Sequence, residues 1–273
     1  MQRVHSEDFE RVRQLYDEAL DDNAPEQELI YPRAYGPSEY VGQYSDNTAS
    51  DLRRMGLAMA LPPGARVLDG GCGPGAVACL YAEEFGWDII GVDISSRHIA
   101  RGRQRVSRSP ASDRVTLRQQ NLYDVSELER FDGAYGTGAW CHFDATELFA
   151  KLGRLIRSGG RVAFMERTRK GLIPEPSYDA ATVGWACPAI YSTDEYIEIM
   201  GAASFRSVMV EDMSPHFRAL QASQIRERLV CREELMRRTS QKQFDTSLDL
   251  ARAEFSLTEQ GLLGYALIVA ERM

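Results

Sequence analysis

A glycine-rich turn behind an acidic residue is the stretch of the sequence best suited to chemistry. Val67 and Leu68 lead into Asp69, the segment GGCGPG follows at 70–75, and apolar residues then recur at roughly helical spacing over 76–85. This order of strand, tight turn and helix directs main-chain amides at a ligand, and glycines let the backbone approach that ligand closely. We therefore interpret the turn as the cradle of a cofactor.

Two cofactors fit this turn, a nicotinamide dinucleotide and S-adenosylmethionine (SAM). The spacing from Gly71 to Ala76 loosely satisfies the dinucleotide pattern, and Asp93 lies at about the right distance to bind a ribose. A nicotinamide protein, however, needs no acid at Asp69, directly before the glycines. Asn121 follows a third predicted strand, where an adenine edge would lie. These additional residues favour SAM.

The elements that must position these residues alternate along the chain. Strands are predicted near 66–69, 88–93, 114–120, 131–136 and 160–167, with helices between them. Such alternation predicts a parallel sheet with helices on both faces, whose ligands bind beyond the carboxyl ends of the strands. The candidate residues all follow strands and therefore converge on one edge of the sheet.

From about residue 65 to 167 the sequence resembles the class I SAM-dependent methyltransferases, through the acid and glycines at 69–75, through Asp93 and Asn121, and through the SGG segment at 158–160. The resemblance implies a Rossmann-like α/β fold. Its seven-stranded, mostly parallel sheet has the order 3-2-1-4-5-7-6, with helices on both faces and an α-helical lid. The cofactor is then SAM, and the product is S-adenosylhomocysteine (SAH).

The wider plan of the chain resembles the small-molecule group that holds antibiotic sugar O-methyltransferases and sterol and geranyl diphosphate C-methyltransferases. This implies a cytoplasmic transferase of secondary metabolism, in antibiotic or terpenoid biosynthesis. Its acceptor would be a small, largely apolar metabolite, methylated on an alkene carbon or on oxygen or nitrogen. Ala139 and Trp140 stand where alkene-methylating members carry a Glu, and no DxxD-like diphosphate–metal motif is present, so the methylated atom stays open.

The resemblance places the cofactor contacts at successive strand ends and in a tyrosine-rich loop before the core. Asp69 helps to hold the methionine ammonium, directly or through water, and Asp93 binds the ribose hydroxyls. Asn121, where the family more often has Asp, pairs with the adenine amino edge. The full expected set is Gln43, Asp69, Gly71, Cys72, Gly73, Asp93, Ile94, Asn121, Leu122 and Gly138.

Methyl transfer needs an in-line nucleophile, exclusion of water and removal of any surplus proton. His142, after the fourth strand, is the best candidate for a general base, although the family often carries a structural His there. Glu166, at the end of the fifth strand, is a base, a ligand for an amine or a buried structural carboxylate. His98 is expected at the surface. The expected substrate contacts are Tyr16, Tyr40, Trp140, Trp185, Tyr191 and His216.

Four segments follow from this pattern. Residues 1–61 form an N-terminal helical lid and substrate region, beginning with an amphipathic helix over 6–20. Residues 62–170 form the SAM-binding core, and residues 171–204 form a substrate-cap insertion. Residues 205–273 complete the core and include one long charged helix from Ser214 to about Arg238. The charged face of that helix is expected in solvent, and it leaves a homo-oligomer contact open.

The amino-acid composition limits the kinds of molecule that the protein is expected to bind. The net charge is −8, which argues against binding a phosphate backbone, so nucleic acid is excluded. Five scattered cysteines without a CxxC pair indicate reduced thiols and no metal site. No apolar run approaches the ~20 residues that insertion in a membrane needs. The alternatives to an enzyme that methylates a small-molecule acceptor are a non-catalytic SAM-binding protein and an NAD-dependent oxidoreductase.

Overall fold

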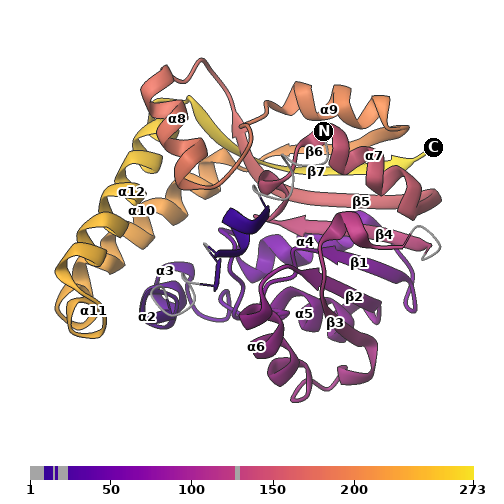
Figure 1. Cartoon of the computed structure of the whole chain (residues 1–273), viewed down its shortest axis with the longest axis horizontal. Coiled ribbons are helices and arrows are strands. Elements are labelled where there is room, and N and C mark those ends of the chain that lie inside the picture. The colour runs from indigo at the N-terminus through magenta and orange to yellow at the C-terminus, as the bar shows by residue number, and fades with distance from the viewer. Residues whose placement is uncertain (1–8, 15, 18–23, 127–129) are drawn as a thin grey trace.

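A central sheet of seven strands organises the computed structural model, which describes residues 9–14, 16–17, 24–126 and 130–273 (Figure 1). The strand order is β3-β2-β1-β4-β5-β7-β6, which confirms the predicted order. Strands β1 to β5 pair in parallel, whereas β7 runs antiparallel between β5 and β6. The strands are Arg66–Gly70 (β1), Asp88–Asp93 (β2), Val115–Gln119 (β3), Phe131–Thr137 (β4), Ile156–Arg169 (β5), Phe205–Asp212 (β6) and Leu263–Arg272 (β7).

Helices cover both faces of this sheet, and a second group of helices projects from it (Figure 1). The covering helices are Ala49–Met59 (α4), Ala76–Phe85 (α5), Ser96–Val106 (α6), Ala145–Leu155 (α7) and Thr193–Ala202 (α9). The remaining ones are Ala24–Leu29 (α2), Tyr31–Tyr35 (α3), Glu175–Gly184 (α8), Ser214–Val230 (α10), Arg232–Arg238 (α11) and Gln241–Glu259 (α12). Short 3₁₀ turns lie at Ser112–Arg114 (η1), Leu122–Asp124 (η2) and Trp140–His142 (η3).

The sheet is buried on both faces, as a parallel sheet between helices must be. Successive residues of a strand point to opposite faces, so Val67 packs with α4 and α5 while Leu68 packs with α7 and α9. In β7, Leu267 packs on the same face of the sheet as Val67, and Ile268 packs on the same face as Leu68. This burial fixes the register of the strands, and the register brings the ends of β1, β2 and β4 level with one another.

The C-terminal helices differ from the sequence prediction. The single long helix expected from Ser214 to about Arg238 breaks at Cys231, whose thiol accepts a hydrogen bond from the Arg33 guanidinium at 3.0 Å. The whole of α12 was not predicted. Helices α10 to α12 enclose a third apolar cluster with α2 and α3, and Arg228, expected in solvent, is buried there against Glu26. The break thus lets the chain fold back over its N-terminal segment.

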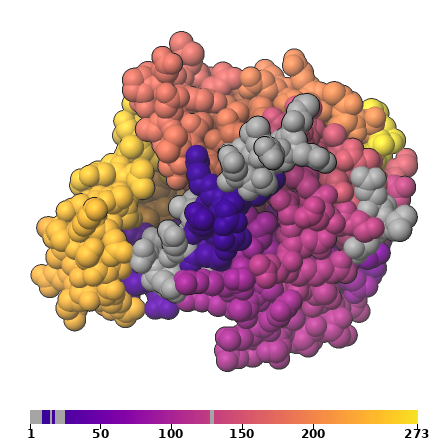
Figure 2. Space-filling model, in the orientation of Figure 1, coloured from indigo at the N-terminus to yellow at the C-terminus, as the bar shows by residue number. Residues whose placement is uncertain are grey.

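The described N-terminal residues, 9–14 and 16–17, are helical and precede the sheet in sequence. They lie across the front face of the molecule, between the core and the α8 region (Figure 2). The rest of the helix predicted over 6–20 lies outside the described residues. Among the described helices, none is both long and apolar enough to cross a bilayer.

We expect Leu267→Ala to lower the free energy of unfolding by about 2–5 kcal/mol, because Leu267 is fully buried between β5 and β6 and its truncation leaves a cavity. Val210→Ala, at a half-exposed position on edge strand β6, should change it by less than about 0.5 kcal/mol. Urea unfolding followed by circular dichroism measures both. Equal losses in the two variants would contradict this placement of the core.

Candidate functional site

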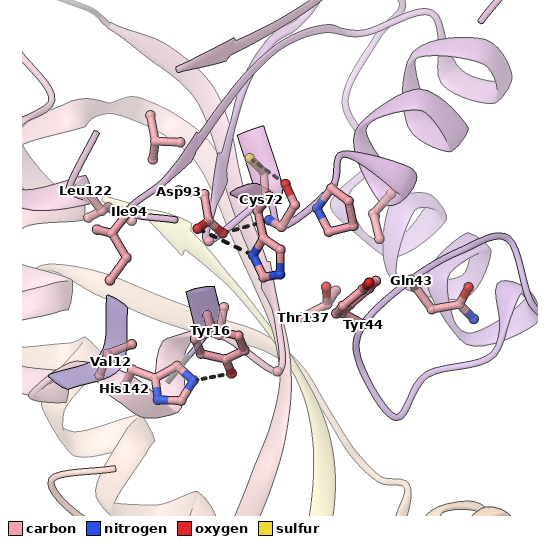
Figure 3. Close-up of a pocket in the computed structure, with 18 of the residues that line it drawn as sticks. Val12, Tyr16, Gln43, Tyr44, Cys72, Asp93, Ile94, Leu122, Thr137 and His142 are labelled. Atoms are coloured by element: carbon pink, nitrogen blue, oxygen red, sulfur yellow. Dashed lines mark hydrogen bonds and ion pairs between the residues drawn. The ribbon is translucent and has the colours of Figure 1, made fainter. Parts of the chain in front are cut away.

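A cavity opens at the carboxyl ends of β1, β2 and β4, beneath the N-terminal helix (Figure 3). It encloses about 800 Å³ of space, open solvent at its mouth included. Of the residues predicted from sequence, Tyr16, Gln43, Gly71, Cys72, Gly73, Asp93, Ile94, Leu122, Gly138 and His142 line it. Residues that sequence reasoning did not assign to it also line it, among them Phe9, Val12, Tyr44, His98, Gln120, Thr137 and Phe143.

The glycine turn forms the floor of this cavity. The amides of Gly71 and Cys72 both donate to the carbonyl of Val92, at 2.9 and 3.0 Å, which holds the turn against the end of β2. Gly71 has a φ of +82°, and a Cβ at that position would collide with the Cβ of Ala139. The turn therefore needs glycine for its conformation and for its close approach to the loop after β4.

Asp93 is the best-placed carboxylate in the cavity. Its two oxygens accept hydrogen bonds from the amides of Gly73 and Ser95, each at 2.8 Å. Each carboxylate oxygen has a further lone pair, so a diol of a ribose can bind without displacing these amides. His98 Nδ1 lies 3.6 Å from the same carboxylate. The expectation that His98 is a surface residue was wrong, since the Ser95 cap that starts α6 turns His98 inward, beside Tyr16.

Asp69 lies behind the turn and not in the cavity lining. Its carboxylate is buried and accepts a hydrogen bond from the Tyr135 hydroxyl at 2.8 Å. Burial raises the pKa of Asp69 to about 7, an effect that the Tyr135 hydrogen bond opposes. Asp69 is thus tied to β4 through Tyr135, and an ammonium group nearby would stabilise its charged form.

The part of the cavity expected to bind adenine matches the prediction at two residues and differs at a third. Ile94 and Leu122 line the cavity from the ends of two neighbouring elements. Asn121 does not line it, because its side-chain oxygen accepts the Tyr123 amide at 3.0 Å and caps the 3₁₀ turn η2. Gln120, one residue earlier, lines the cavity instead. An amide side chain suits either role, so the sequence alone did not distinguish the two positions.

The tyrosine-rich loop contributes Gly42, Gln43 and Tyr44 to the lining of the cavity. Gln43 lines the cavity, but its amide accepts the Val41 amide at 2.7 Å and donates to the carbonyls of Glu39 and Asn47. Gln43 is therefore the internal brace of the loop. Tyr40 does not line the cavity and packs against Tyr31 and Tyr35 in an aromatic cluster.

Tyr16 and His142 meet over the cavity although 126 residues separate them (Figure 3). The Tyr16 hydroxyl lies 2.7 Å from His142 Nε2, and His142 Nδ1 lies 3.2 Å from the carbonyl of Ala186. A carbonyl can only accept, so Nδ1 carries the hydrogen in the neutral imidazole and Nε2 accepts the phenol hydrogen. Burial raises the pKa of Tyr16 well above its ordinary value, which keeps it a phenol.

A pair of cysteines adjoins His142. Ligand atoms of Cys141, His142 and Cys187 lie within 4.8 Å of one another, a grouping that sequence reasoning missed because Cys187 arrives from the insertion after β5. A hydrogen bond with Cys187 lowers the pKa of Cys141, and so does the adjacent His142 imidazole. Burial acts in the opposite direction, but the net shift of the pKa is downward. Burial lowers the pKa of His142, but interaction with Cys141 outweighs it, and the net shift is upward.

Glu166 positions the turn that carries these groups and does not itself line the cavity. One oxygen accepts the amides of Trp140 and Cys141, at 2.8 and 3.3 Å, at the start of η3. The side chain is fully buried, and burial raises its pKa well above the ordinary range. Among the roles considered from sequence, that of a buried structural carboxylate matches this placement.

Most of the expected substrate contacts lie elsewhere. Trp140 is buried and donates its indole hydrogen to the Gly70 carbonyl at 3.1 Å, and Trp185 packs beneath the Arg167 guanidinium. The Tyr191 hydroxyl bonds the start of α7. His216 is half exposed, and its Nε2 lies 3.0 Å from the carboxylate of Asp51 in α4. Each side chain is held by a partner from another part of the chain, which sequence reasoning could not identify. Among the expected substrate contacts, Tyr16 lines the cavity.

A second cavity adjoins the first. It encloses about 980 Å³, solvent at its mouth included, and is lined by Phe9, Arg11, Val12, Tyr123, His142, Asp144, Thr182, Val183, Ala186, Cys187 and Pro188. Phe9, Val12 and His142 line both cavities. The imidazole therefore stands in the wall between the cavity at the strand ends and a second cavity, of mixed apolar and polar lining, beside α8.

Comparison with known proteins agrees with the fold. A family model described as a methyltransferase domain matches residues 67–160, which span β1 to the start of β5. A 27-O-demethylrifamycin SV methyltransferase of Amycolatopsis mediterranei is 26% identical over 258 residues, which cover 89% of this chain and 93% of that protein.

Two further matches extend the comparison. A SAM-dependent Diels-Alderase of Talaromyces variabilis is 31% identical over 159 residues, so this chain spans only about half of that relative, 54% of its length. The structure of a phosphoethanolamine N-methyltransferase 2 of Haemonchus contortus, in complex with phosphomonomethylethanolamine and SAH, superposes with a TM-score of 0.81 at 20% identity. That match covers 95% of this chain and 60% of the other.

Asp93→Ala should weaken SAH binding by about 100-fold or more, because it removes a carboxylate whose hydrogen bonds to ligand hydroxyls are each worth about 1.5–3 kcal/mol. Asp88→Ala is the matched control at the opposite end of the same strand, where the carboxylate is exposed and pairs with Arg114. Its affinity should stay within about twofold of the parent. Isothermal calorimetry with SAH measures both, and an unchanged affinity in Asp93→Ala would refute the assignment.

Proposed function

Because the chain belongs to the class I SAM-dependent methyltransferases and its cofactor is SAM, we propose that it methylates a hydroxyl oxygen of a small, largely apolar metabolite. The observation that carries this proposal is the Tyr16–His142 pair in the wall shared by the two cavities. A hydroxyl must lose a proton as it is methylated, and this pair can accept one.

The first cavity fits the parts of SAM in order. Ile94 and Leu122 offer apolar contact to the adenine, and the Asp93 carboxylate faces the ribose. The methionine part then lies over Gly71 and Gly73, whose amides are fixed by the end of β2. In this orientation the sulfonium methyl points toward His142 and the second cavity.

The second cavity supports an apolar acceptor. Phe9, Val12, Val183 and Pro188 supply apolar surface, while Arg11, Asp144 and Thr182 are its polar members. We assign residues 1–61 as the lid and residues 171–204 as the cap of this space. Both segments lie outside the SAM-binding core, residues 62–170, and they can therefore vary with the acceptor while the contacts from that core stay fixed.

The proton that the acceptor loses moves along the hydrogen bond between Tyr16 and His142. As the acceptor oxygen bonds the methyl carbon and the S–CH₃ bond breaks, neutral SAH forms and the acceptor gives up its proton. The Tyr16 hydroxyl takes that proton while passing its own to His142 Nε2, 2.7 Å away. His142 retains its Nδ1 hydrogen on the Ala186 carbonyl and becomes the imidazolium, which the neighbouring Cys141 stabilises.

Methylation of oxygen fits these groups better than methylation of an alkene. Ala139 and Trp140 stand where alkene-methylating enzymes carry a Glu, and Trp140 is buried in the core. The acid after β4 that lines the second cavity, Asp144, accepts the Glu147 amide at the start of α7. The relative from Amycolatopsis mediterranei, named for O-methylation of a rifamycin, supports an acceptor from antibiotic-type secondary metabolism. We favour that class over a terpenoid diphosphate, which would need several cations, because Arg11 is the one arginine or lysine among the described residues that line the second cavity.

A second candidate function comes from the relative with 31% identity, a SAM-dependent Diels-Alderase. In that case SAM would stay bound and a cyclisation would take place in the second cavity without release of SAH. The two functions differ in stoichiometry, because only methyl transfer consumes one SAM for each product.

The test is label transfer from [methyl-¹⁴C]SAM to 27-O-demethylrifamycin SV and to other apolar hydroxylated polyketides, with phosphoethanolamine as the polar comparison. We expect the label in an apolar O-methyl product, with one SAH formed for each label transferred. A preference for phosphoethanolamine, or a product labelled on carbon, would contradict the proposal. Conversion of a polyene probe without SAH formation would favour the second candidate.

His142→Gln should lower kcat by about 100-fold or more, since it removes the proton acceptor. In the parent, kcat/KM should rise with pH through a value above 6.5, because the base must be neutral and its pKa is raised. Cys141→Ser removes the neighbour responsible for that rise, so the ascending limb should move to lower pH while burial still acts. A limb that stays in place in Cys141→Ser and persists in His142→Gln would contradict the role of His142.

A further inference from the structure

We propose that Cys141 and Cys187 form a site of reversible oxidation, closing to a disulfide in the presence of a peroxide. The two residues lie on different elements: Cys141 is in η3, which carries the base, and Cys187 follows α8 in the cap insertion. Their sulfur atoms and a ring nitrogen of His142 lie within 4.8 Å of one another. The crosslink would therefore join the cap to the catalytic turn.

The surroundings of the pair allow the sulfur atoms to close. Cys187 Sγ donates a hydrogen bond to the Trp185 carbonyl at 3.3 Å, and Cys141 Sγ contacts the Gly138 carbonyl at 4.0 Å. Thiols form weak hydrogen bonds, so neither contact holds its sulfur strongly. Cys187 also lines the second cavity, which gives a peroxide the size of hydrogen peroxide a route to the pair.

The chemistry of the pair is asymmetric and balanced. The Cys141 thiol gives up its proton, which its neighbours Cys187 and His142 favour, and the thiolate attacks one oxygen of hydrogen peroxide. The O–O bond breaks, and the departing hydroxide takes up that proton to form the first water. Cys141 is then a sulfenic acid. The Cys187 thiol displaces its hydroxyl group, forming the S–S bond and a second water. Two thiols are oxidised, and one peroxide is reduced to two waters.

A metal centre is the less favoured use of the same three side chains. Coordination by His142 requires a free ring nitrogen, but Nε2 is bonded to Tyr16 and Nδ1 to the Ala186 carbonyl. A metal would have to break one of these contacts, and the cluster supplies only three protein ligands among the described residues. The disulfide needs neither change, because it leaves the imidazole where it is.

Closure of the disulfide has a consequence for the proposed methyl transfer, and this part rests on that function. It removes the Cys141 thiolate that stabilises the imidazolium of His142, and it fixes the cap against η3. Neither cysteine lines the first cavity, so the cofactor contacts remain. We therefore expect the oxidised protein to bind SAH as before while methyl transfer falls at least tenfold and returns with dithiothreitol.

The experiment treats fully reduced protein with one equivalent of hydrogen peroxide, alkylates the free thiols and maps the peptides by mass spectrometry. We expect a Cys141–Cys187 peptide pair with a loss of about 2 Da, formed at least tenfold faster than any oxidation of Cys72, Cys79 or Cys231. Cys187→Ser should leave Cys141 as a trappable sulfenic acid. Cys231→Ser, a buried cysteine of the helical extension, is the matched control and should form the crosslink normally.

The crosslink and its rate decide the proposal without any acceptor, so a failed methyl-transfer assay leaves it intact. Uniform alkylation of all five cysteines after peroxide would overturn it. Oxidation of Cys141 to a sulfinic acid while Cys187 stays free would also overturn it. A stoichiometric metal ion in the reduced protein that requires both cysteines would replace the disulfide with a metal centre.

Discussion

The carboxylate of Asp93 is the interaction on which the candidate site depends. It receives the amide of Gly73 from the glycine turn and the amide of Ser95 from the start of α6. The Ser95 hydroxyl in turn donates to Asp17, in the helix over the cavity, at 2.6 Å. One side chain at the end of β2 therefore connects the turn, a core helix and the N-terminal helix, and a ligand that binds it affects all three.

The parts of the fold that follow from local periodicity could be predicted from the sequence. The glycine turn, Asp93 and Leu122 lie where strand ends converge, because the register of a buried parallel sheet leaves little freedom in their positions. The helix break at Cys231 and the packing of α12 back against the N-terminal segment depend on contacts with α2 and α3. No local sequence pattern could therefore predict them. The same holds for the pairing of Tyr16 with His142 across 126 residues.

Several polar residues suggested a ligand-binding role but bind the protein itself. Gln43 bonds three main-chain groups of its own loop, Asn121 caps a 3₁₀ turn, and Glu166 accepts two amides of η3. An amide or carboxylate side chain satisfies a backbone group as well as it satisfies a ligand, and a buried backbone group without a partner is costly. The sequence can identify such a residue as a candidate. Only its hydrogen-bond partners in the structure show whether it binds a ligand or the protein's own backbone.

In the proposed function, the strand ends hold SAM with its methyl directed at Tyr16 and His142. A crystal structure of the protein with SAH tests this most directly. We expect the ribose diol on Asp93, the adenine between Ile94 and Leu122, and the sulfur facing the second cavity beside His142. SAH bound elsewhere, or with its sulfur turned away from the Tyr16–His142 pair, would contradict the proposed mode of binding.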